Sequence, residues 1–414
     1  MPAAPLPAAP RGSRSPGTRS ATASGTRASR LVILTGLDVR AYRGGEKYAA
    51  SLGRELAARG VEVRLLSKVD PNEHHRLPLA DVPAVLRLPV EFYRLFWLPL
   101  VPPVPLTPRQ LLRAFQWSDT VYTMEVTPRF VALVVFLGKL LRRRVVLGLH
   151  HPTLADDLAA ELRGPGRRRW GSGLFREVLR AADAIHVLNA HQAETLAAIG
   201  LRDNVSVVPN YTTRAPPASV AREGTAFEIL FVGPLEREQK GIDLLAEVAG
   251  RLLPHLPQAR LTVVGTGRDL PLVERMVADH PGQVRRLGFV PEERLEELYA
   301  ASHALCLTSR AEAFPAVAME GYAHGLPVVA FAVPGLEDLS VVYPAGRVPP
   351  FDTAAFADRL LALYRLWRDD RPAYERLRQG CRSEVLARFG VDVQLPRLAG
   401  ILGVRLRSDG GPTP

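Results

Sequence analysis

One stretch of the sequence, residues 309–330, limits what this chain can fold into more than any other. Two apolar runs bound it, 303–309 and 326–331, and each has the length typical of a buried strand. Between the runs, residues 316–323 have the pattern of a short helix. A strand, a helix and a second strand in this order predict an α/β fold with a parallel sheet. Because such sheets bind ligands beyond the carboxyl ends of their strands, the residues after each strand are candidates for a site.

Two acidic residues lie in that stretch, Glu312 before the predicted helix and Glu320 within it. Pro315 suits the first helical position, where its missing N–H costs nothing, and Gly325 suits the helix end. The unpaired N–H groups at a helix start favour a diphosphate. A carboxylate accepts two hydrogen bonds, so Glu320 could take both hydroxyls of a ribose and Glu312 the hydroxyls of a sugar. The alternative is a strand–helix–strand unit whose two acids are only solvated.

Length, charge and cysteine content narrow the class of protein. The 414 residues predict two or three domains, each with room for its own core. The net charge of +11 favours anionic partners such as phosphates or acidic lipid head groups, unless it reflects only a genomic bias toward arginine. No zinc-finger spacing or helix-turn-helix pattern stands out, so no nucleic acid is expected as a partner. Cys306 and Cys381 form neither a metal spacing nor a disulfide framework, which fits a reducing, cytoplasmic compartment.

The first half of the chain contains a second strand–helix–strand unit. An apolar strand over 31–35 is followed by a glycine pair, Gly44 and Gly45, that opens a helix, and then by a strand over 61–66. This order is typical of a mononucleotide-binding unit, although the glycines lack the spacing of a dinucleotide site. The glycine pair either lets the backbone approach a ligand closely or only forms a tight turn.

The stretch around the two acids, with its turn at Phe314 and Pro315 and its second strand, resembles the nucleotide-sugar site of retaining glycosyltransferases of family 4. The resemblance covers nearly all of 30–390. It implies an α/β fold of the GT-B type, in which two Rossmann-like domains face a central cleft. It also implies a nucleoside diphosphate sugar as donor substrate, a hydroxyl acceptor, no separate cofactor and no metal.

The resemblance and the composition together divide the chain into five parts. The strand that ends in Val208-Pro-Asn210 closes the first domain, and a polar, Pro-rich segment follows it. The parts are a disordered basic tail (1–28), an N-terminal acceptor-binding Rossmann-like domain (29–210), a linker (211–225), a C-terminal nucleotide-sugar-binding Rossmann-like domain (226–388), and a helix that returns to the first domain with a flexible end (389–414).

The donor-binding motifs of the family can be compared with this sequence position by position, and most but not all positions agree. Lys240 is present as the family requires, but Pro234 stands where the family has an arginine that contacts the diphosphate. Arg237 in the same loop is a candidate replacement. A lysine supplies charge without the planar fork of arginine, so phosphate binding would be arranged differently. The implied donor-binding residues are Gly44, Gly45, Arg237, Lys240, Gly265, Gly267, Phe289, Glu312, Phe314, Pro315, Ala316 and Glu320.

A strand over 145–152 ends in two histidines, His150 and His151. A histidine at the carboxyl end of a strand faces the ligand side, where it can donate to a sugar hydroxyl or carry a proton. The family has a histidine near the transferred sugar at this point; His150 matches it and His151 is the second choice. With Glu312 and Lys240, His150 completes the implied catalytic set, in which cationic side chains rather than a metal stabilise the leaving diphosphate. No second carboxylate is evident as a nucleophile, so front-face attack with retained configuration is expected.

Two segments indicate contact with a membrane surface. Residues 82–116 are apolar, aromatic and rich in proline, which excludes a membrane-spanning helix. They form either a loop insertion over the acceptor cleft or an element that dips into the interface. The basic loop 164–173 either binds an acidic head group or is a solvated turn. With the aromatic patch 92–97, these features favour a lipid-linked acceptor or polysaccharide precursor and peripheral attachment at the inner membrane face.

Two other functions are compatible with the same pattern. The first is a different enzyme on the same fold, a nucleotide-sugar epimerase or a phosphorylase; an epimerase would need no acceptor. The second is a non-catalytic sugar-nucleotide-binding protein of an envelope polysaccharide pathway, which Pro234 suggests. The fold alone does not decide among these functions.

Overall fold

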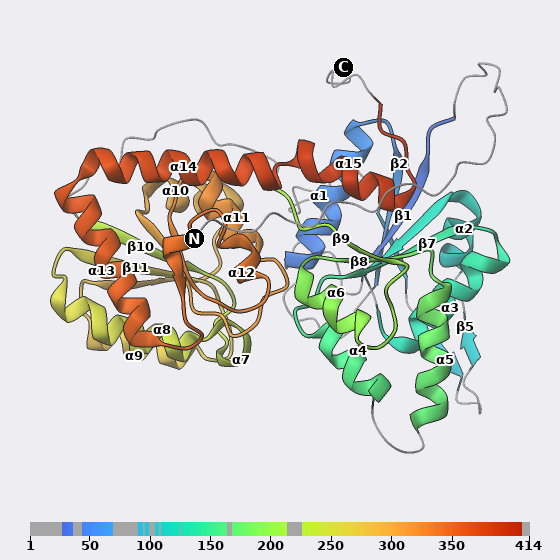
Figure 1. The fold of residues 1–414 in the computed structure, drawn as a ribbon, viewed down its shortest axis with the longest axis horizontal. Coiled ribbons are helices and arrows are strands. Elements are labelled where there is room, and N and C mark those ends of the chain that lie inside the picture. The colour runs from blue at the N-terminus through green and yellow to red at the C-terminus, as the bar shows by residue number, and fades with distance from the viewer. Residues whose placement is uncertain are drawn as a thin grey trace.

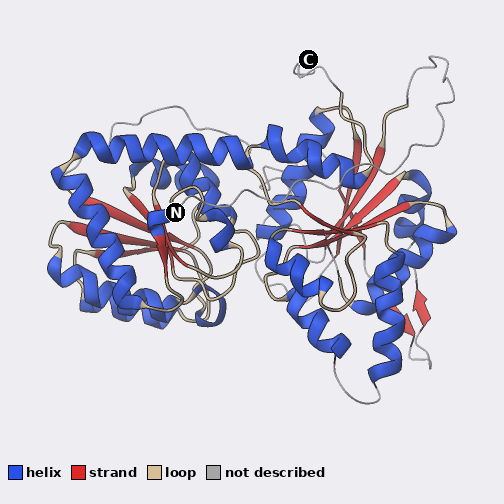
Figure 2. Cartoon of the chain, in the orientation of Figure 1, coloured by secondary structure: helices blue, strands red, loops and turns tan. Residues whose placement is uncertain are grey.

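The computed structural model describes residues 27–35, 44–68, 90–93, 96–98, 104–106, 109–124, 126–163, 168–212 and 226–407. These residues form two α/β units, and in each unit helices surround a sheet (Figure 1; Figure 2). The expected tail up to residue 26, the linker from 213 and the end from 408 lie outside the described residues. None of the helices in the described ranges combines the length and the apolarity that a membrane crossing requires.

The N-terminal unit contains a parallel sheet of seven strands. These are β1 (Arg30–Thr35), β2 (Glu62–Lys68), β3 (Val90–Tyr93), β6 (Thr120–Thr123), β7 (Arg144–Leu149), β8 (Ala184–Val187) and β9 (Val205–Val207). Their order across the sheet is β3-β2-β1-β6-β7-β8-β9. Leu31 of β1 lies opposite Val63 of β2 and opposite Thr120 of β6. The winding of the sheet therefore reverses between β1 and β6, and β1 is buried on both sides, as its uninterrupted apolar run predicts.

Six described helices accompany this sheet. They are α1 (Gly44–Ala58), α2 (Arg109–Trp117), α3 (Pro128–Leu140), α4 (Leu154–Arg163), α5 (Arg168–Ala181) and α6 (Ala190–Ala197). The prediction of a loop over 164–173 is wrong from Arg168 onward, because α5 begins there. The apolar face of α5 buries Phe175 and Leu179, and this packing outweighs the glycines that suggested a loop.

The proline-rich segment 82–116 contains strands as well as loop. β3 adds an edge strand to the sheet, and β4 (Phe96–Leu98) pairs with β5 (Val104–Leu106) in an antiparallel hairpin. The prediction of a loop insertion is therefore wrong for these strands. Pro105 lies within β5, and a two-stranded ribbon has only edge strands, where proline is tolerated.

The C-terminal unit contains a parallel sheet of six strands. These are β10 (Phe227–Val232), β11 (Ala259–Val264), β12 (Val284–Leu287), β13 (Ala304–Leu307), β14 (Val328–Phe331) and β15 (Arg347–Val348). The order β12-β11-β10-β13-β14-β15 reverses its winding between β10 and β13. This is the kind of position at which open α/β sheets bind ligands.

Eight helices and two short 3-10 turns cover the described part of this sheet. They are α7 (Arg237–Lys240), α8 (Ile242–Leu252), η3 (Leu253–His255), α9 (Leu270–Asp279), α10 (Glu292–Ala301), α11 (Ala316–Ala323), α12 (Leu336–Leu339), η4 (Pro344–Gly346), α13 (Thr353–Asp369) and α14 (Arg371–Phe389). The bounds of α11 are those that the sequence predicts. Pro315 is its N-cap residue, in extended conformation, so the prediction that it occupies the first helical position is wrong by one residue; Gly325 follows the helix with a φ of +71°.

The last two helices connect the units. Figure 1 shows α14 along the C-terminal unit and α15 (Val391–Leu402) against the N-terminal one. Leu395 and Leu398 of α15 are buried in the same apolar cluster as Leu31 of β1. The hydroxyl of Thr120 donates to the carbonyl oxygen of Leu402 over 2.9 Å. The core of the N-terminal unit is therefore completed by residues from the far end of the chain.

Candidate active site

The loops after β10 and β13 meet where the C-terminal sheet reverses its winding. Thr308, just after β13, donates its hydroxyl to the carbonyl oxygens of Lys240 at 3.2 Å and Gly241 at 3.0 Å. Gly241 has a φ of +61°, and a Cβ there would lie 2.1 Å from the carbonyl oxygen of Thr308. Only glycine lets the two loops come this close. The end of α7 is thus fixed against the segment that carries Glu312.

Lys240 and Glu312 form a largely buried ion pair at this junction. Nζ of Lys240 lies 2.5 Å from Oε1 of Glu312, and the two side chains expose 17% and 7% of their surface. The hydroxyl of Ser309 donates to the same carboxylate oxygen over 2.7 Å. The structure therefore brings together two of the three predicted catalytic residues.

Arg310 supports this pair and was missed by the sequence analysis. Its two terminal nitrogens lie 2.7 and 2.8 Å from the carboxylate oxygens of Asp243 in α8, and the first also donates to the carbonyl oxygen of Arg237 over 2.7 Å. The guanidinium holds the pKa of Asp243 below its usual range. An arginine in a loop carries no spacing signal, so only the folded chain shows that it ties α7 and α8 to the loop after β13.

The structure places Arg237 away from the ion pair. Its Nε lies 3.0 Å from Oδ1 of Asp269, and its backbone N–H donates to Oδ2 over 2.8 Å. The side chain remains 55% exposed. Its suggested role as a replacement for the arginine missing at Pro234 stays a prediction.

Gly265 and Gly267 are needed for the packing of two loops. A Cβ at Gly265, whose φ is +143°, would lie 1.9 Å from the carbonyl oxygen of Gly233. A Cβ at Gly267 would lie 2.4 Å from the carbonyl oxygen of Leu235. The loops after β10 and β11 therefore touch backbone to backbone. Phe289, after β12, exposes 65% of its side chain on the surface.

Two asparagines of the N-terminal unit hold the loop that carries Glu312. Asn189, after β8, donates its amide to the carbonyl oxygen of Ala313 over 2.7 Å. Asn210, after β9, donates to the carbonyl oxygen of Phe314 over 3.0 Å. Asn210 was expected only to close the first domain, and no contact with the second unit was predicted for either asparagine. These bonds seat the turn before α11 against the carboxyl ends of the N-terminal strands.

Glu320, the expected ribose ligand, is engaged by both units. The hydroxyl of Tyr299 donates to its Oε2 over 2.8 Å, and Nζ of Lys47 lies 3.1 Å from its Oε1. Lys47 belongs to the first turn of α1, two residues after the predicted glycine pair Gly44 and Gly45. The carboxylate is therefore paired with a cation from the opposite unit.

His150 directly follows β7 and lies in a cluster of aromatic rings. Its Nε2 lies 2.6 Å from the hydroxyl of Tyr122, whose oxygen lies 2.7 Å from Nδ1 of His186. The ring of Tyr48 packs on it at a centroid distance of 4.8 Å. Burial lowers the pKa of His150 well below its ordinary value and the pKa of His186 to about 4, so both rings are neutral at pH 7. His151 is exposed and lies outside this cluster.

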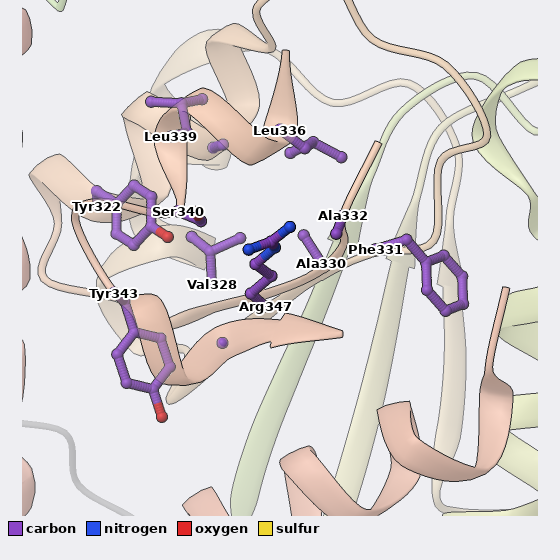
Figure 3. A pocket seen from close by; sticks show the side chains of 12 residues that line it. Tyr322, Val328, Ala330, Phe331, Ala332, Leu336, Leu339, Ser340, Tyr343 and Arg347 are labelled. Atoms are coloured by element: carbon purple, nitrogen blue, oxygen red, sulfur yellow. The ribbon is translucent and has the colours of Figure 1, made fainter. Parts of the chain in front are cut away.

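The pocket in Figure 3 does not mark this site. It lies inside the C-terminal unit among α11, α12, β14 and β15, and most of its lining is apolar. The one charged residue of its lining, Arg347, pairs with Glu337. None of the predicted catalytic or donor-binding residues lines it.

Two family models match the chain in succession. The model "Glycosyl transferase 4-like domain" matches residues 43–211, and the model "Glycosyl transferases group 1" matches residues 226–365. Each α/β unit thus corresponds to one model. This chain belongs to the glycosyl transferases of group 1. In this group 1 transferase, His150 falls within the first match and the Lys240–Glu312 pair within the second.

Several curated relatives of the group 1 transferase are named D-inositol 3-phosphate glycosyltransferase. The chain is 35% identical over 245 residues to a D-inositol 3-phosphate glycosyltransferase of Xylanimonas cellulosilytica, covering 52% of this chain and 55% of that protein. It is 33% identical over 218 residues to the protein of the same name from Geodermatophilus obscurus, covering 45% of this chain and 47% of the other. The alignments therefore span about half the length of these relatives.

Solved structures of similar fold cover nearly the whole group 1 transferase. The Anabaena protein HepE in complex with UDP-glucose superposes with a TM-score of 0.67 at 17% identity, over 90% of this chain and 99% of HepE. A sucrose-phosphate synthase from Thermosynechococcus elongatus gives a TM-score of 0.63 at 22% identity, over 90% and 98%. The expected GT-B fold of two Rossmann-like domains is confirmed.

Proposed function

We propose that this chain transfers a sugar from a nucleoside diphosphate sugar to a hydroxyl acceptor, with retained anomeric configuration and without a metal ion. The observation that carries the proposal is the buried Lys240–Glu312 pair at the switch point of the C-terminal sheet. The lysine offers positive charge to a leaving diphosphate, and the carboxylate can accept hydrogen bonds from sugar hydroxyls. The UDP-glucose complex of HepE supports a UDP-sugar as the donor.

The surrounding loops would bind the rest of the donor. The backbone at Phe314, Pro315 and Ala316 faces the start of α11, where a diphosphate is favoured. Glu320 would accept the ribose hydroxyls once the donor displaces Lys47 from it. The exposed ring of Phe289, together with the loop of Gly265 and Gly267, would receive the base.

In the proposed reaction, the bond between the anomeric carbon and the diphosphate oxygen breaks while the acceptor oxygen forms its bond on the same face of the sugar. The acceptor proton passes to the leaving phosphate oxygen. Lys240 stabilises the charge that develops on the diphosphate. His150, which is neutral, binds a hydroxyl near the reacting centre rather than the diphosphate.

The test is a transfer assay on the whole chain with UDP- and GDP-sugars as donors and D-inositol 3-phosphate as the first acceptor, because the relatives carry that name. We expect acceptor-dependent release of nucleoside diphosphate and a product whose anomeric configuration, by NMR, is that of the donor. Glu312→Gln should lower kcat at least 100-fold, whereas Glu297→Gln, at an exposed ion pair on α10, should not. Conversion of the donor without acceptor would indicate an epimerase, and an inverted product would overturn the retaining mechanism.

A lipid-linked acceptor is the second proposal for the substrate. Phe136 and Leu140 on α3 are each 64% exposed, and Leu174 on α5 is 70% exposed. α3 and α5 pack side by side, and Arg142 is exposed just after α3. An apolar patch beside a cation fits the surface of an anionic bilayer.

Flotation with phosphatidylglycerol liposomes tests this contact. The chain should float at low salt and less at high salt, because screening weakens the charge attraction. Phe136→Ser with Leu140→Ser should abolish flotation at both salt concentrations. Absence of flotation of the unaltered chain at low salt would refute the membrane contact without affecting the proposed transfer.

A further inference from the structure

A chain of hydrogen bonds runs from the backbone of the N-terminal domain to His150. Nε2 of His186 lies 2.7 Å from the carbonyl oxygen of Val208, and Nδ1 of the same ring lies 2.7 Å from the hydroxyl of Tyr122. That hydroxyl lies 2.6 Å from Nε2 of His150. Tyr122 and His186 are fully buried, whereas His150 is partly exposed. The chain thus leads from the core to a side chain that is partly exposed at the surface.

The direction of each bond follows from its two partners. A carbonyl oxygen only accepts, so Nε2 of His186 carries a hydrogen. Because burial keeps His186 neutral, its Nδ1 carries none and accepts the single hydroxyl hydrogen of Tyr122. The oxygen of Tyr122 must then accept from Nε2–H of His150. In a neutral His150, this leaves Nδ1 without a hydrogen.

The strand that carries His150 is shaped for this arrangement. Gly148 lies two residues before His150 in β7, and a Cβ there would lie 2.5 Å from the hydroxyl oxygen of Tyr122. Only the missing side chain lets that hydroxyl reach both rings. The other rings of the cluster, Tyr48 and Tyr211, carry hydroxyls that have no hydrogen-bond partner within the described part of the chain. Neither of them competes for the histidine nitrogens.

We propose that Tyr122 and His186 are positioning residues that fix His150 in the tautomer protonated at Nε2 and keep Nδ1 as a hydrogen-bond acceptor. The proposal deepens the proposed sugar transfer and rests on it for its ligand. The group that meets Nδ1 must donate a hydrogen bond, as a sugar or acceptor hydroxyl does and a phosphate dianion does not. This hydrogen-bond relay, which runs from Val208 through His186 and Tyr122 to His150, therefore favours a hydroxyl as the ligand of Nδ1. The diphosphate would bind to Lys240 instead.

The first test reads the tautomer directly and needs no activity. Two-dimensional 1H–15N NMR of the whole chain labelled at histidine distinguishes a ring protonated at Nε2 from one protonated at Nδ1. His150→Gln and His186→Gln assign the two rings by loss of their signals. We expect both rings to be protonated at Nε2 only at pH 7. A His150 ring protonated at Nδ1, or at both nitrogens, would overturn the proposal.

The second test breaks the relay. Tyr122→Phe should convert His150 to a mixture of tautomers and lower kcat/KM roughly fivefold to tenfold, the effect of one lost hydrogen bond. Tyr48→Phe removes a hydroxyl from the same cluster without touching the relay, and it should leave the tautomer unchanged. If Tyr122→Phe alters neither the NMR pattern nor kcat/KM of an active enzyme, the positioning role is wrong and the transfer stands. If the Nε2 tautomer is observed in a chain with no transfer activity, the proposed function is wrong and the tautomer assignment stands.

Discussion

The ion pair of Lys240 and Glu312 affects stability in two opposite ways. Removing two charges from water is costly, and only their close contact, with the added bond from Ser309, offsets that cost. The pair as a whole therefore contributes little to stability, while the loss of one partner leaves a charge buried without a counter-charge. Such a pair suits a binding site, because a ligand that supplies new partners to Lys240 and Glu312 can separate them without a large loss of stability.

Removing one partner should be far more costly than removing both. We expect Glu312→Leu to lower the free energy of unfolding by roughly 3 kcal/mol, because Lys240 stays behind as an unpaired charge. The double variant Lys240→Met, Glu312→Leu should recover most of that loss. Urea unfolding followed by circular dichroism measures both. Glu297→Leu, which breaks an exposed pair, is the control and should change stability by no more than about 1 kcal/mol.

Acid should destabilise the N-terminal domain through its buried histidines. The pKa of His186 is lowered to about 4 in the folded chain, against an ordinary value of about 6.5. Between these values the unfolded chain binds a proton that the folded chain does not, so the free energy of unfolding falls as the pH falls. For His186 alone the loss is on the order of 3 kcal/mol by pH 4, and His150 acts in the same direction. Unfolding measured from pH 7 to pH 4.5 should show a shallower slope for His186→Gln, and equal slopes would contradict the prediction.

At the scale of elements, local signals decided what could be predicted. The bounds of α11 were predictable because Pro315 and Gly325 mark both of its ends, and its flanking strands are continuous apolar runs. Helix α5 was missed because Gly171 and Gly173 lower its helix propensity, while its packing against α3 and α4 overrides them. β3 to β5 were missed because they are short and depend on pairing rather than on an alternating pattern.

The same limit applies to the candidate site. Lys240 and Glu312 lie a few residues beyond the ends of apolar strands, so their spacing to those strands was informative. Tyr122 and His186 are 64 residues apart, and Asn189 is 124 residues from its partner Ala313. Such contacts depend on strand order, which the sequence pattern does not determine.

The glycines of the second domain offer a matched pair of substitutions. Gly265→Ala should lower the free energy of unfolding by roughly 3 kcal/mol or more, because φ is positive and the added Cβ would meet the carbonyl oxygen of Gly233. Gly250 lies within α8, and a Cβ added there would meet no atom within 4 Å. Gly250→Ala should therefore raise the free energy of unfolding by about 0.5–1 kcal/mol. Thermal unfolding of the two variants measures the contrast. A Gly265→Ala variant as stable as the original chain would show that this loop contact is not required.

At the scale of the whole molecule, hydrogen bonds and the ion pairs of Lys47 with Glu292 and Glu320 link the two domains near the site. Asn189 and Asn210 hold the loop that carries Glu312, and Lys47 reaches across to Glu320. A donor that takes the carboxylate of Glu320 would therefore compete with a contact between the domains. If the proposed donor binds there, its binding and the arrangement of the domains would be coupled through this carboxylate.

Loss of the two asparagine amides should loosen the arrangement of the domains. Asn189→Ala with Asn210→Ala leaves two carbonyl oxygens without partners, at about 1–3 kcal/mol each if they stay buried. We expect small-angle X-ray scattering to show a larger radius of gyration and longer distances within the molecule. Asn204→Ala removes side-chain hydrogen bonds that lie entirely within the N-terminal domain, so it should leave the radius of gyration unchanged. An unchanged radius in the double variant would show that other contacts set the arrangement.

Helix α15 follows both sheets in the chain, yet its Leu395, Leu398 and Leu402 pack beside Leu31 and Ile33 of the first strand. A ribosome that makes this protein therefore exposes one face of the N-terminal sheet long before the segment that shields it exists. Chaperones would meet that apolar face throughout the synthesis of the second domain. A premature stop codon just before α15 would leave the second sheet complete and the first one uncovered. A mutation near the 3′ end of the coding sequence would therefore cause misfolding of the N-terminal domain.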